Sequence, residues 1–155
     1  MKNVFKILAA AVFFGALGWL GIYLYWHFKI IGAIKTMESR AVPQSPGSAL
    51  PYSVPEEQVA ELRAAGCRAL PYLVSSLEGS KNPMYLLAAS DLIQKFVAPA
   101  DPSQGSSFPS DNTFSGDDSA ELRQRKCQII KEWWRGRSLE YHQTWRVWTD
   151  RCPKE

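Results

Sequence analysis

The residues that most often carry catalysis or bind metals are few in this sequence and lie far apart. The two histidines, His27 and His142, have no second ligand or acid at the spacing of a zinc site or a catalytic triad. No phosphate-binding loop and no G-x-G-x-x-G pattern occurs. The sequence therefore predicts no catalytic residue, no metal and no cofactor, and it favours a protein that is not an enzyme.

The three cysteines, Cys67, Cys127 and Cys152, share no C-x-x-C spacing and are too few for a disulfide scaffold. In an oxidising compartment we expect Cys127 and Cys152 to form a disulfide between the last helix and its neighbour, which would stabilise the domain by a few kcal/mol. Cys67 is then a small buried hydrophobic residue. In the cytoplasm all three would remain thiols.

The C-terminal stretch, residues 120–155, combines nine basic and five acidic residues with four tryptophans. Arginine and aromatic side chains are enriched at protein interfaces, so this stretch is a candidate interaction surface. Its candidate residues are Trp133, Trp134, Trp145, Trp148, Arg135, Arg137 and Arg146. The alternative is that the tryptophans form the core of a small domain. We expect two helices here, separated at Gly136, that pack as an antiparallel hairpin.

The preceding segment, residues 98–118, has four acidic residues, no basic residue and three prolines. A loop of this length is expected to be mobile, and either functional or disordered. Within it, residues 111–117 resemble the start of a calcium-binding loop, with oxygen-bearing side chains at alternate positions. Leu122 stands where the bidentate glutamate of such a loop belongs, so we predict a solvated loop and not a calcium site.

The element that must position these residues is an apolar segment near the start of the chain. Residues 7–28 are 22 residues without a formal charge. They would form about 33 Å of helix, against a hydrocarbon core of about 30 Å. Because the run exceeds the usual signal-peptide core and no A-x-A site follows, we predict an uncleaved signal-anchor. A cleaved secretory signal is the alternative.

Small residues form a stripe along this helix, at Ala11, Gly15 and Gly18, and Ile22 continues it. Small residues allow close packing between membrane helices, so these four residues are the candidate helix-packing site. The alternative is that glycine is simply common in membrane helices.

The charge balance fits an anchor better than nucleic-acid binding. The chain has 18 basic and 15 acidic residues, a net charge of +3, and its first 30 residues hold three lysines and no acid. The remaining residues are balanced, with 15 of each sign. The excess therefore flanks one apolar helix. We expect the lipid bilayer and proteins of a membrane complex as partners, and no nucleic acid.

Orientation follows less directly, because basic residues lie on both sides of the helix. Lys2 and Lys6 precede it, and Lys29, Lys35 and Arg40 follow it. A short, basic, signal-like N-terminus usually remains in the cytoplasm. We therefore expect a cytoplasmic N-terminus and a C-terminal domain that is periplasmic or otherwise outside the cytoplasm.

Composition divides the chain into three parts. We expect residues 1–40 to form the anchor helix with a juxtamembrane extension. Residues 41–55 hold four prolines and predict an extended linker that holds the domain off the bilayer. Residues 56–155 show apolar residues at helical spacing in several runs and no alternating strand pattern. The sequence thus predicts an all-α fold.

Part of this domain resembles a HEAT-like helical repeat. Residues 62–77 follow the pattern L-x-x-x-G-x-x-A-L-P-x-L-x-x-x-L, and residues 85–96 resemble the second helix of such a repeat. The pair Trp133 and Trp134 resembles the closing helix of some bacterial repeat proteins. The resemblance covers about one repeat and implies a helical hairpin with a binding surface. It also implies stacked neighbours, because one repeat cannot bury its own apolar face.

Together these features lead us to expect a single-pass membrane protein with a small helical domain. It would mediate protein–protein interaction as an accessory or scaffold subunit of a membrane complex. Two alternatives remain. The HEAT-like resemblance implies a chromophore lyase or assembly chaperone, whereas Trp145 and Trp148 with the nearby arginines favour a peripheral domain that binds anionic lipid.

Overall fold

The computed structural model describes residues 2–44, 51–97, 108–109, 111 and 113–143. In this part of the chain the fold is mostly helical, with one small two-stranded sheet. The elements are α1 Lys2–Arg40, β1 Val42–Pro43, β2 Tyr52–Ser53, α2 Glu56–Ala65, the 3-10 helix η1 Gly66–Ala69, α3 Leu70–Gly79, α4 Pro83–Val97 and α5 Ala120–Gln143. The predicted helical character is confirmed.

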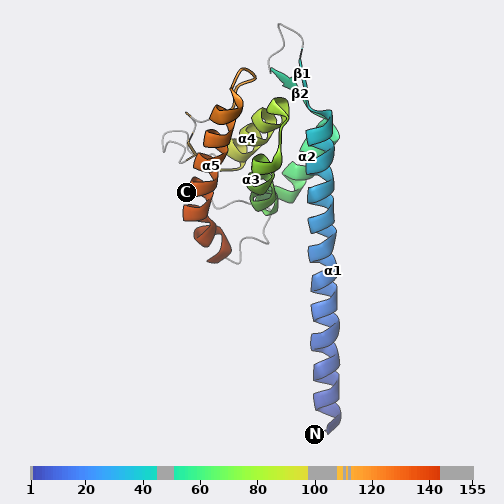
Figure 1. The fold of residues 1–155 in the computed structure, drawn as a ribbon. Helices are drawn as coiled ribbons and strands as arrows, with labels where there is room; N and C mark the ends of the chain where they lie inside the picture. The colour runs from blue at the N-terminus through green and yellow to red at the C-terminus, as the bar shows by residue number, and fades with distance from the viewer. Residues whose placement is uncertain (1, 45–50, 98–107, 110, 112, 144–155) are drawn as a thin grey trace.

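Helix α1 is 39 residues long, and its N-terminal end projects far beyond the rest of the molecule (Figure 1). By length and composition it can cross a membrane, as the uncharged run predicts. Its C-terminal turns lie beside α2 and contribute Ile30, Ile34 and Met37 to the core of the domain. One helix is therefore both the candidate anchor and a core element.

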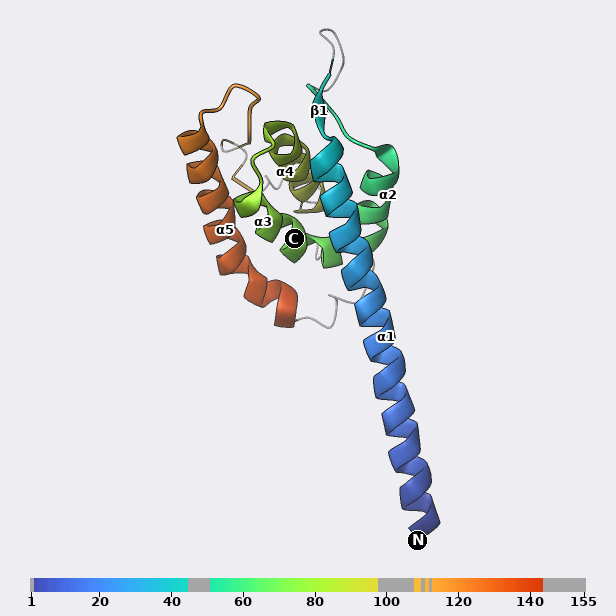
Figure 2. The ribbon, with the colours of Figure 1, turned by 45° about the vertical axis from the view of Figure 1, so that its right-hand side comes forward.

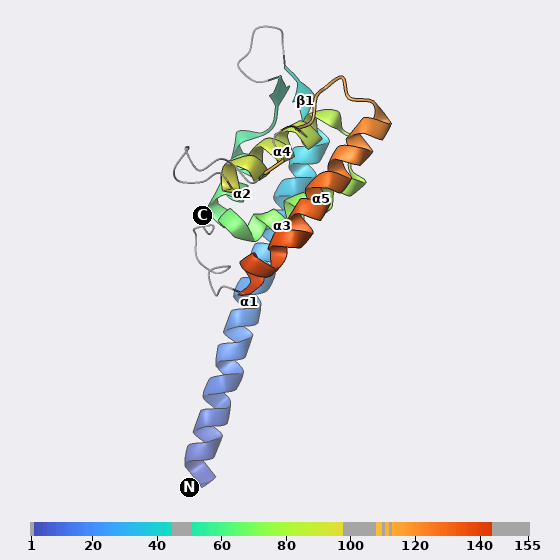
Figure 3. The ribbon, with the colours of Figure 1, turned by 90° about the vertical axis from the view of Figure 1, so that its left-hand side faces the viewer.

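The remaining helices are arranged around α3, which buries one apolar stripe through Leu70, Leu73, Val74 and Leu77. Helices α1 and α2 lie on one side of α3, α5 packs on the other side, and α4 pairs with α3 (Figure 1, Figure 2). The C-terminal end of α5 lies on the side of the domain from which α1 projects (Figure 3). Helices α2, α3 and α4 fall where the apolar periodicity predicts helices.

The proline-rich segment after α1 differs from the expected spacer. Strands β1 and β2 pair antiparallel, with Val42 opposite Ser53 and Pro43 opposite Tyr52. Ala41 and Tyr52 are both buried. The chain thus turns back onto the domain, which is joined to α1 by direct packing. The described residues of the segment 41–55 do not separate helix and domain as the predicted linker would.

Asn82 fixes the start of α4 to the end of α1. Its side-chain Nδ2 donates to the carbonyl oxygens of Glu38 at 2.8 Å and Ala41 at 3.0 Å. Its Oδ1 accepts the backbone N–H groups of Met84 at 3.0 Å and Tyr85 at 3.3 Å. One side chain therefore satisfies the last carbonyl groups of one helix and the first N–H groups of another.

A glycine sets the bend between α2 and α3. Gly66 has φ 58° and ψ −136°, and its N–H lies against the carbonyl oxygens of Leu62 and Arg63. This φ suits glycine because glycine has no Cβ. Residues 62–77, which resemble one helix of a HEAT-like repeat, are consequently divided among α2, η1 and α3.

The C-terminal stretch is also organised differently from the prediction. Helix α5 continues through Gly136 to Gln143 as one helix of 24 residues, so the expected pair of helices separated at Gly136 is wrong. Ser119 caps its start, because its Oγ accepts the Leu122 N–H at 3.2 Å. A glycine inside a helix costs only about 1 kcal/mol, which the packing of the earlier turns outweighs.

The core lies between α3, α4 and the facing sides of α1, α2 and α5. Its largest fully buried side chains include Met37, Leu62, Leu70, Leu73, Leu77, Tyr85, Leu86, Ile93 and Ile130. Two residues of the acidic segment also belong to it, since Phe108 and Phe114 are 2% and 3% exposed. The expected mobile, solvated loop is therefore built into the core at these two rings, each of which removes a large apolar area from water.

Candidate functional site

The N-terminal half of α1 is exposed on all of its faces from residue 11 to residue 25. The candidate packing residues Ala11, Gly15, Gly18 and Ile22 lie on this surface. Apart from the adjoining residues and the backbone of α1 itself, no atom of the described residues lies within 4 Å of the position that a Cβ would take at Gly15 or Gly18. An apolar surface of this kind requires lipid or another apolar surface to cover it. Whether the stripe packs against a second helix stays a prediction.

Contact between α1 and the domain begins at Tyr23, which is hydrogen-bonded to Tyr72, and continues at Trp26 and His27. His27 Nδ1 lies 2.9 Å from the Tyr72 hydroxyl, and the two rings meet edge to face with centroids 5.4 Å apart. Tyr72 stands in the first turn of α3. Burial raises the pKa of the Tyr72 hydroxyl, so it is protonated at neutral pH. This contact joins the end of the uncharged run to the domain.

Two cations flank the Trp26 indole at the same level. Lys29 Nζ lies 5.9 Å from a ring centroid of Trp26 and 3.7 Å from Glu61 Oε1. Arg68 Cζ lies 5.2 Å from the Trp26 ring centroid. Tryptophan faces attract cations, and tryptophan with lysine and arginine is typical of the membrane–water interface. The geometry thus brings η1 and the start of α3 to the end of the apolar run.

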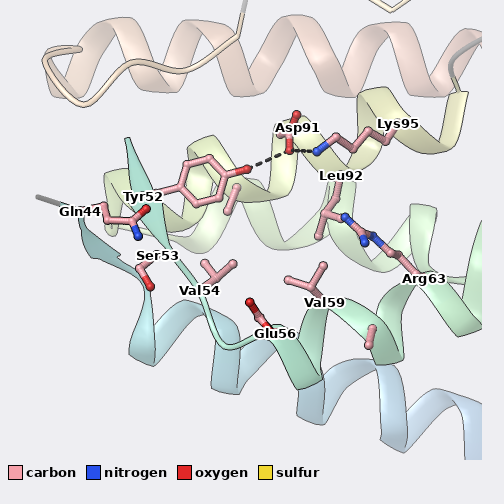
Figure 4. A pocket seen from close by; sticks show the side chains of 12 residues that line it. Gln44, Tyr52, Ser53, Val54, Glu56, Val59, Arg63, Asp91, Leu92 and Lys95 are labelled. Carbon is pink, nitrogen blue, oxygen red and sulfur yellow. Dashed lines mark hydrogen bonds and ion pairs between the residues drawn. The ribbon is translucent and has the colours of Figure 1, made fainter. Parts of the chain in front are cut away.

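A pocket of about 500 Å³ lies between β2, α2 and α4 (Figure 4). Its apolar lining residues are Val54, Val59, Ala60, Ala88 and Leu92. On its α4 side, the Tyr52 hydroxyl donates to Asp91 Oδ2 at 2.8 Å, and Lys95 Nζ donates to the same oxygen at 2.6 Å. Burial and the hydrogen bond to Asp91 raise the pKa of Tyr52 well above its usual value. This wall of the pocket is a closed network of a hydroxyl, a carboxylate and an ammonium group.

Arg63 of α2 stands on the rim of the same pocket, with its side chain reaching toward Leu92 in Figure 4. Arg63 is exposed, and it takes part in none of the ion pairs that the described residues form. Glu56, in the first turn of α2, lines the pocket further toward the start of that helix. Arg63 lies seven positions after Glu56 in α2, about 10 Å further along the helix axis. The pocket therefore has an acidic end and an end with an uncompensated cation.

The described end of the acidic segment is held against α5 by a partly buried ion pair. Lys126 Nζ donates to Asp118 Oδ2 at 2.7 Å and to the Thr113 carbonyl oxygen at 2.8 Å. Burial alone would raise the pKa of Asp118, but Lys126 and the Ser115 N–H outweigh it and hold that pKa below its usual range. The carboxylate fixes the loop, and no group of three potential metal ligands occurs among the residues that the structure describes.

The predicted tryptophan-rich surface is described only in part. Trp133 and Trp134 are half-buried against the core, and the Phe108 ring meets Trp133 edge to face at 5.3 Å between centroids. Arg135 is exposed, and Arg137 follows it within α5. Trp145, Arg146 and Trp148 lie outside the described residues. Two of the four tryptophans thus pack on the domain, and the binding role of the set stays a prediction.

The cysteines differ from the prediction. Cys127 is a free thiol that is 7% exposed, and its Sγ donates to the Leu77 carbonyl oxygen at 3.3 Å. Burial raises the pKa of this thiol. The predicted bridge between Cys127 and Cys152 is therefore wrong at Cys127, whose side chain is taken up by the contact between α3 and α5. Cys67, expected to be unpaired, is disulfide-bonded, and Cys152 lies outside the described residues.

Sequence reasoning missed Arg68, Tyr72 and Asp91 as site residues. A signal for Asp91 exists, because an acid four residues before a base, here Lys95, forms an ion pair on one helix face. Nothing in the sequence joins this pair to Tyr52, which lies 39 residues earlier. Arg68 and Tyr72 fall within an apolar repeat-like pattern, where the polar positions carry no periodic signal of their own.

Comparison with known proteins does not assign this chain to a family. No protein-family model, no curated protein and no solved structure matches the chain. Its function must therefore be inferred from the residues and contacts described above.

Proposed function

We propose that this protein is a single-pass, membrane-anchored accessory or scaffold subunit that mediates protein–protein interaction in a membrane complex. The contrast along α1 supports this proposal. Residues 11–25 are exposed on every face, whereas Ile30, Ile34 and Met37 are 2%, 6% and 0% exposed in the domain core. A long exposed apolar helix needs lipid or other helices around it. Because the C-terminal part of the same helix belongs to the core of the domain, a membrane location of the helix also holds the domain at the membrane.

The same packing favours an uncleaved anchor. Cleavage after residue 28 would cut a continuous helix between the contact of His27 with Tyr72 and the buried Ile30. It would also remove Trp26 from the ring contacts of Arg68 and Lys29. A cut at this position would therefore sacrifice side chains that the domain uses, which is not expected of a removable signal.

The disulfide state supports a domain outside the cytoplasm, with the N-terminus inside. Cys67 is disulfide-bonded, and disulfides persist in oxidising compartments. Cys127 is a free thiol and is not the partner of Cys67. Peptide mapping without reduction should recover Cys67 in a disulfide-linked peptide. Alkylation of Cys67 in native membranes would contradict both the disulfide and the orientation.

The HEAT-like resemblance enters the proposal at the α3–α4 pair. These two helices pack on each other directly after the bend at Gly66, as the two helices of one repeat would. Helices α1 and α5 cover the faces that stacked repeats would otherwise cover. The alternative function, as a chromophore lyase or assembly chaperone, is supported by the resemblance alone.

The stripe on α1 gives the direct test of the proposal. Gly15→Leu combined with Gly18→Leu adds bulk at two positions where the structure holds no neighbouring atom, so the domain itself should stay folded. Co-purification in mild detergent should lose the proteins that the wild type retains, because close helix approach needs small residues. Ala16→Leu, the same kind of change on another exposed face of α1, is the matched control and should retain them. Equal co-purification of all three chains would reject the stripe as the contact.

A second candidate function is binding of anionic lipid at the junction, favoured by the two cations that flank Trp26. Hydrogen exchange in nanodiscs tests it. Amides of η1 should exchange more slowly in phosphatidylserine nanodiscs than in phosphatidylcholine nanodiscs, and Arg68→Gln should remove the difference. Equal exchange in both lipids would leave the junction as a purely structural contact.

A further inference from the structure

The pocket between β2, α2 and α4 combines three features that a short peptide segment would use. The first is an apolar floor. Val59 and Leu92 line it from facing helices (Figure 4), and Ala60 is a further lining residue. A volume of about 500 Å³ is within the range of small-ligand sites and accommodates an apolar side chain with the backbone on either side of it.

The second feature is the charge on the rim. Asp91 accepts both the Tyr52 hydroxyl and the Lys95 ammonium group, so its negative charge is compensated within the wall. Arg63 forms no ion pair in the described part of the chain. A guanidinium beside an apolar floor attracts a carboxylate, which it can bind with two parallel hydrogen bonds.

The third feature is the strand that forms one wall. The sheet consists of β1 and β2 in the described residues, so β2 has one strand neighbour. Tyr52, Ser53 and Val54 line the pocket from this extended segment. An extended segment bordering a groove favours an extended peptide as occupant, because backbone groups then pair while side chains enter the pocket.

We propose that this pocket binds a short extended segment of a partner protein in which an apolar side chain adjoins an aspartate or glutamate. The apolar side chain lies on the floor between Val59 and Leu92, and the carboxylate pairs with Arg63. This inference rests on the proposed role as an interaction subunit and supplies the chemistry of one partner. The pocket and the stripe on α1 are separate surfaces, so each is tested without the other.

Selection from a random hexapeptide library, displayed on phage, tests the proposal with the full chain held in nanodiscs. Peptides enriched on the wild type should combine an acidic residue with a neighbouring large apolar residue. Enrichment should disappear on Ala60→Trp, which fills the pocket from an exposed position. Ala64→Trp is the matched control, because Ala64 is exposed on the same helix and does not line the pocket. It should bind the same peptides as the wild type.

The role of Arg63 is measured on the synthesised peptides by fluorescence anisotropy. Arg63→Gln should weaken binding by about tenfold or more, because a charge-assisted hydrogen-bonded pair is lost. Arg125→Gln, which removes an exposed arginine from α5 outside the pocket, should leave the affinity unchanged.

Three outcomes would overturn the inference. They are a selection that enriches nothing above the Ala60→Trp background, enriched peptides without acidic residues, and affinities that Arg63→Gln does not change. A fourth would also overturn it: competition by a free carboxylate such as hexanoate that matches the peptides would assign the pocket to a small molecule. None of these results bears on co-purification through Gly15 and Gly18, so failure here leaves the proposed function standing.

Discussion

Both halves of α1 carry large apolar side chains, but the surroundings of these side chains are opposite. In the first half, Leu17 is 48% exposed and Phe14 is 70% exposed, whereas in the second half Met37 is fully buried. No break in the helix separates them. Apolar character alone therefore does not distinguish a membrane segment from a core segment. What distinguishes them is whether the chain supplies a covering surface, which α2 and α3 do from Trp26 onward.

Removal of α1 should have the largest effect on the folding of the domain. A chain that starts at residue 41 lacks Ile30, Ile34 and Met37, and each large-to-small loss in a core costs about 2–5 kcal/mol. The sum approaches the whole stability of a small domain, about 5–15 kcal/mol, so this chain should not fold cooperatively. A chain that starts at residue 26 should fold. Near-ultraviolet circular dichroism with thermal unfolding distinguishes the two, and a cooperative transition in the shorter chain would show that α1 is dispensable.

A pair of single substitutions measures how much one side chain from each half of α1 contributes to stability. Met37→Ala should lower the free energy of unfolding by about 2–5 kcal/mol, since it leaves a cavity in the core. Leu17→Ala, in the exposed half, should change it by less than about 0.5 kcal/mol. Hydrogen exchange of the α3 amides in nanodiscs reports both values on the same chain. Similar losses for the two variants would mean that the halves are not energetically distinct.

The boundary between the halves is tested at Tyr72. Tyr72→Phe removes the hydroxyl that meets His27 Nδ1 at 2.9 Å and should destabilise the domain by about 1 kcal/mol. The matched control is Tyr25→Phe, because the Tyr25 side chain is exposed and its hydroxyl accepts a long hydrogen bond, 3.5 Å, from Lys29 Nζ. Urea unfolding in detergent measures both. If Tyr25→Phe costs as much, the contact of His27 with Tyr72 is not the boundary of the folded domain.

The smallest expected effect lies in the alkaline titration of Tyr85. Burial raises the pKa of this hydroxyl, its hydrogen bond with Ser76 lowers it, and the Glu38 carboxylate of α1 raises it further. The pKa of Tyr85 in the folded protein lies above its unfolded value near 10. The contribution of this hydroxyl to stability is therefore fully present below pH 10 and is lost as pH rises from there through the folded pKa. Glu38→Gln should lower the pKa of Tyr85 in an ultraviolet titration at 295 nm. An unchanged titration would show that the Glu38 carboxylate of α1 does not affect the pKa of Tyr85.

Much of the secondary structure follows from the sequence, because local signals decide it. The uncharged run over residues 7–28 predicts α1, and the stripe of Leu70, Leu73 and Leu77 predicts α3. The role of the second half of α1 could not be predicted, since Ile30 and Met37 have the same spacing in a free juxtamembrane helix as in a core helix. Burial is a tertiary property, and it depends on α2 folding back through the β1–β2 hairpin.

Only two parts of the candidate site could be predicted from the sequence. The exposed Gly15 and Gly18 follow from helical periodicity, and the Asp91–Lys95 pair follows from its four-residue spacing. The contact of His27 with Tyr72 spans 45 residues and that of Cys127 with Leu77 spans 50, and no local pattern encodes either. The turn signal at Gly136 failed for a related reason, because helix packing outweighed the preference of one glycine.

The continuity of α1 also fixes a direction. At about 100° per residue, the stripe of Ala11, Gly15, Gly18 and Ile22 and the domain-facing side at Ile30, Ile34 and Met37 lie about a quarter turn apart around the helix axis. A partner that covers the stripe therefore fixes the rotation of the domain about the axis of α1, and with it the direction that the pocket rim at Arg63 faces. One residue inserted near Gly21 would rotate the domain by about 100° and move it about 1.5 Å along the axis. Four inserted residues would bring the rotation back to within about 40° of the original.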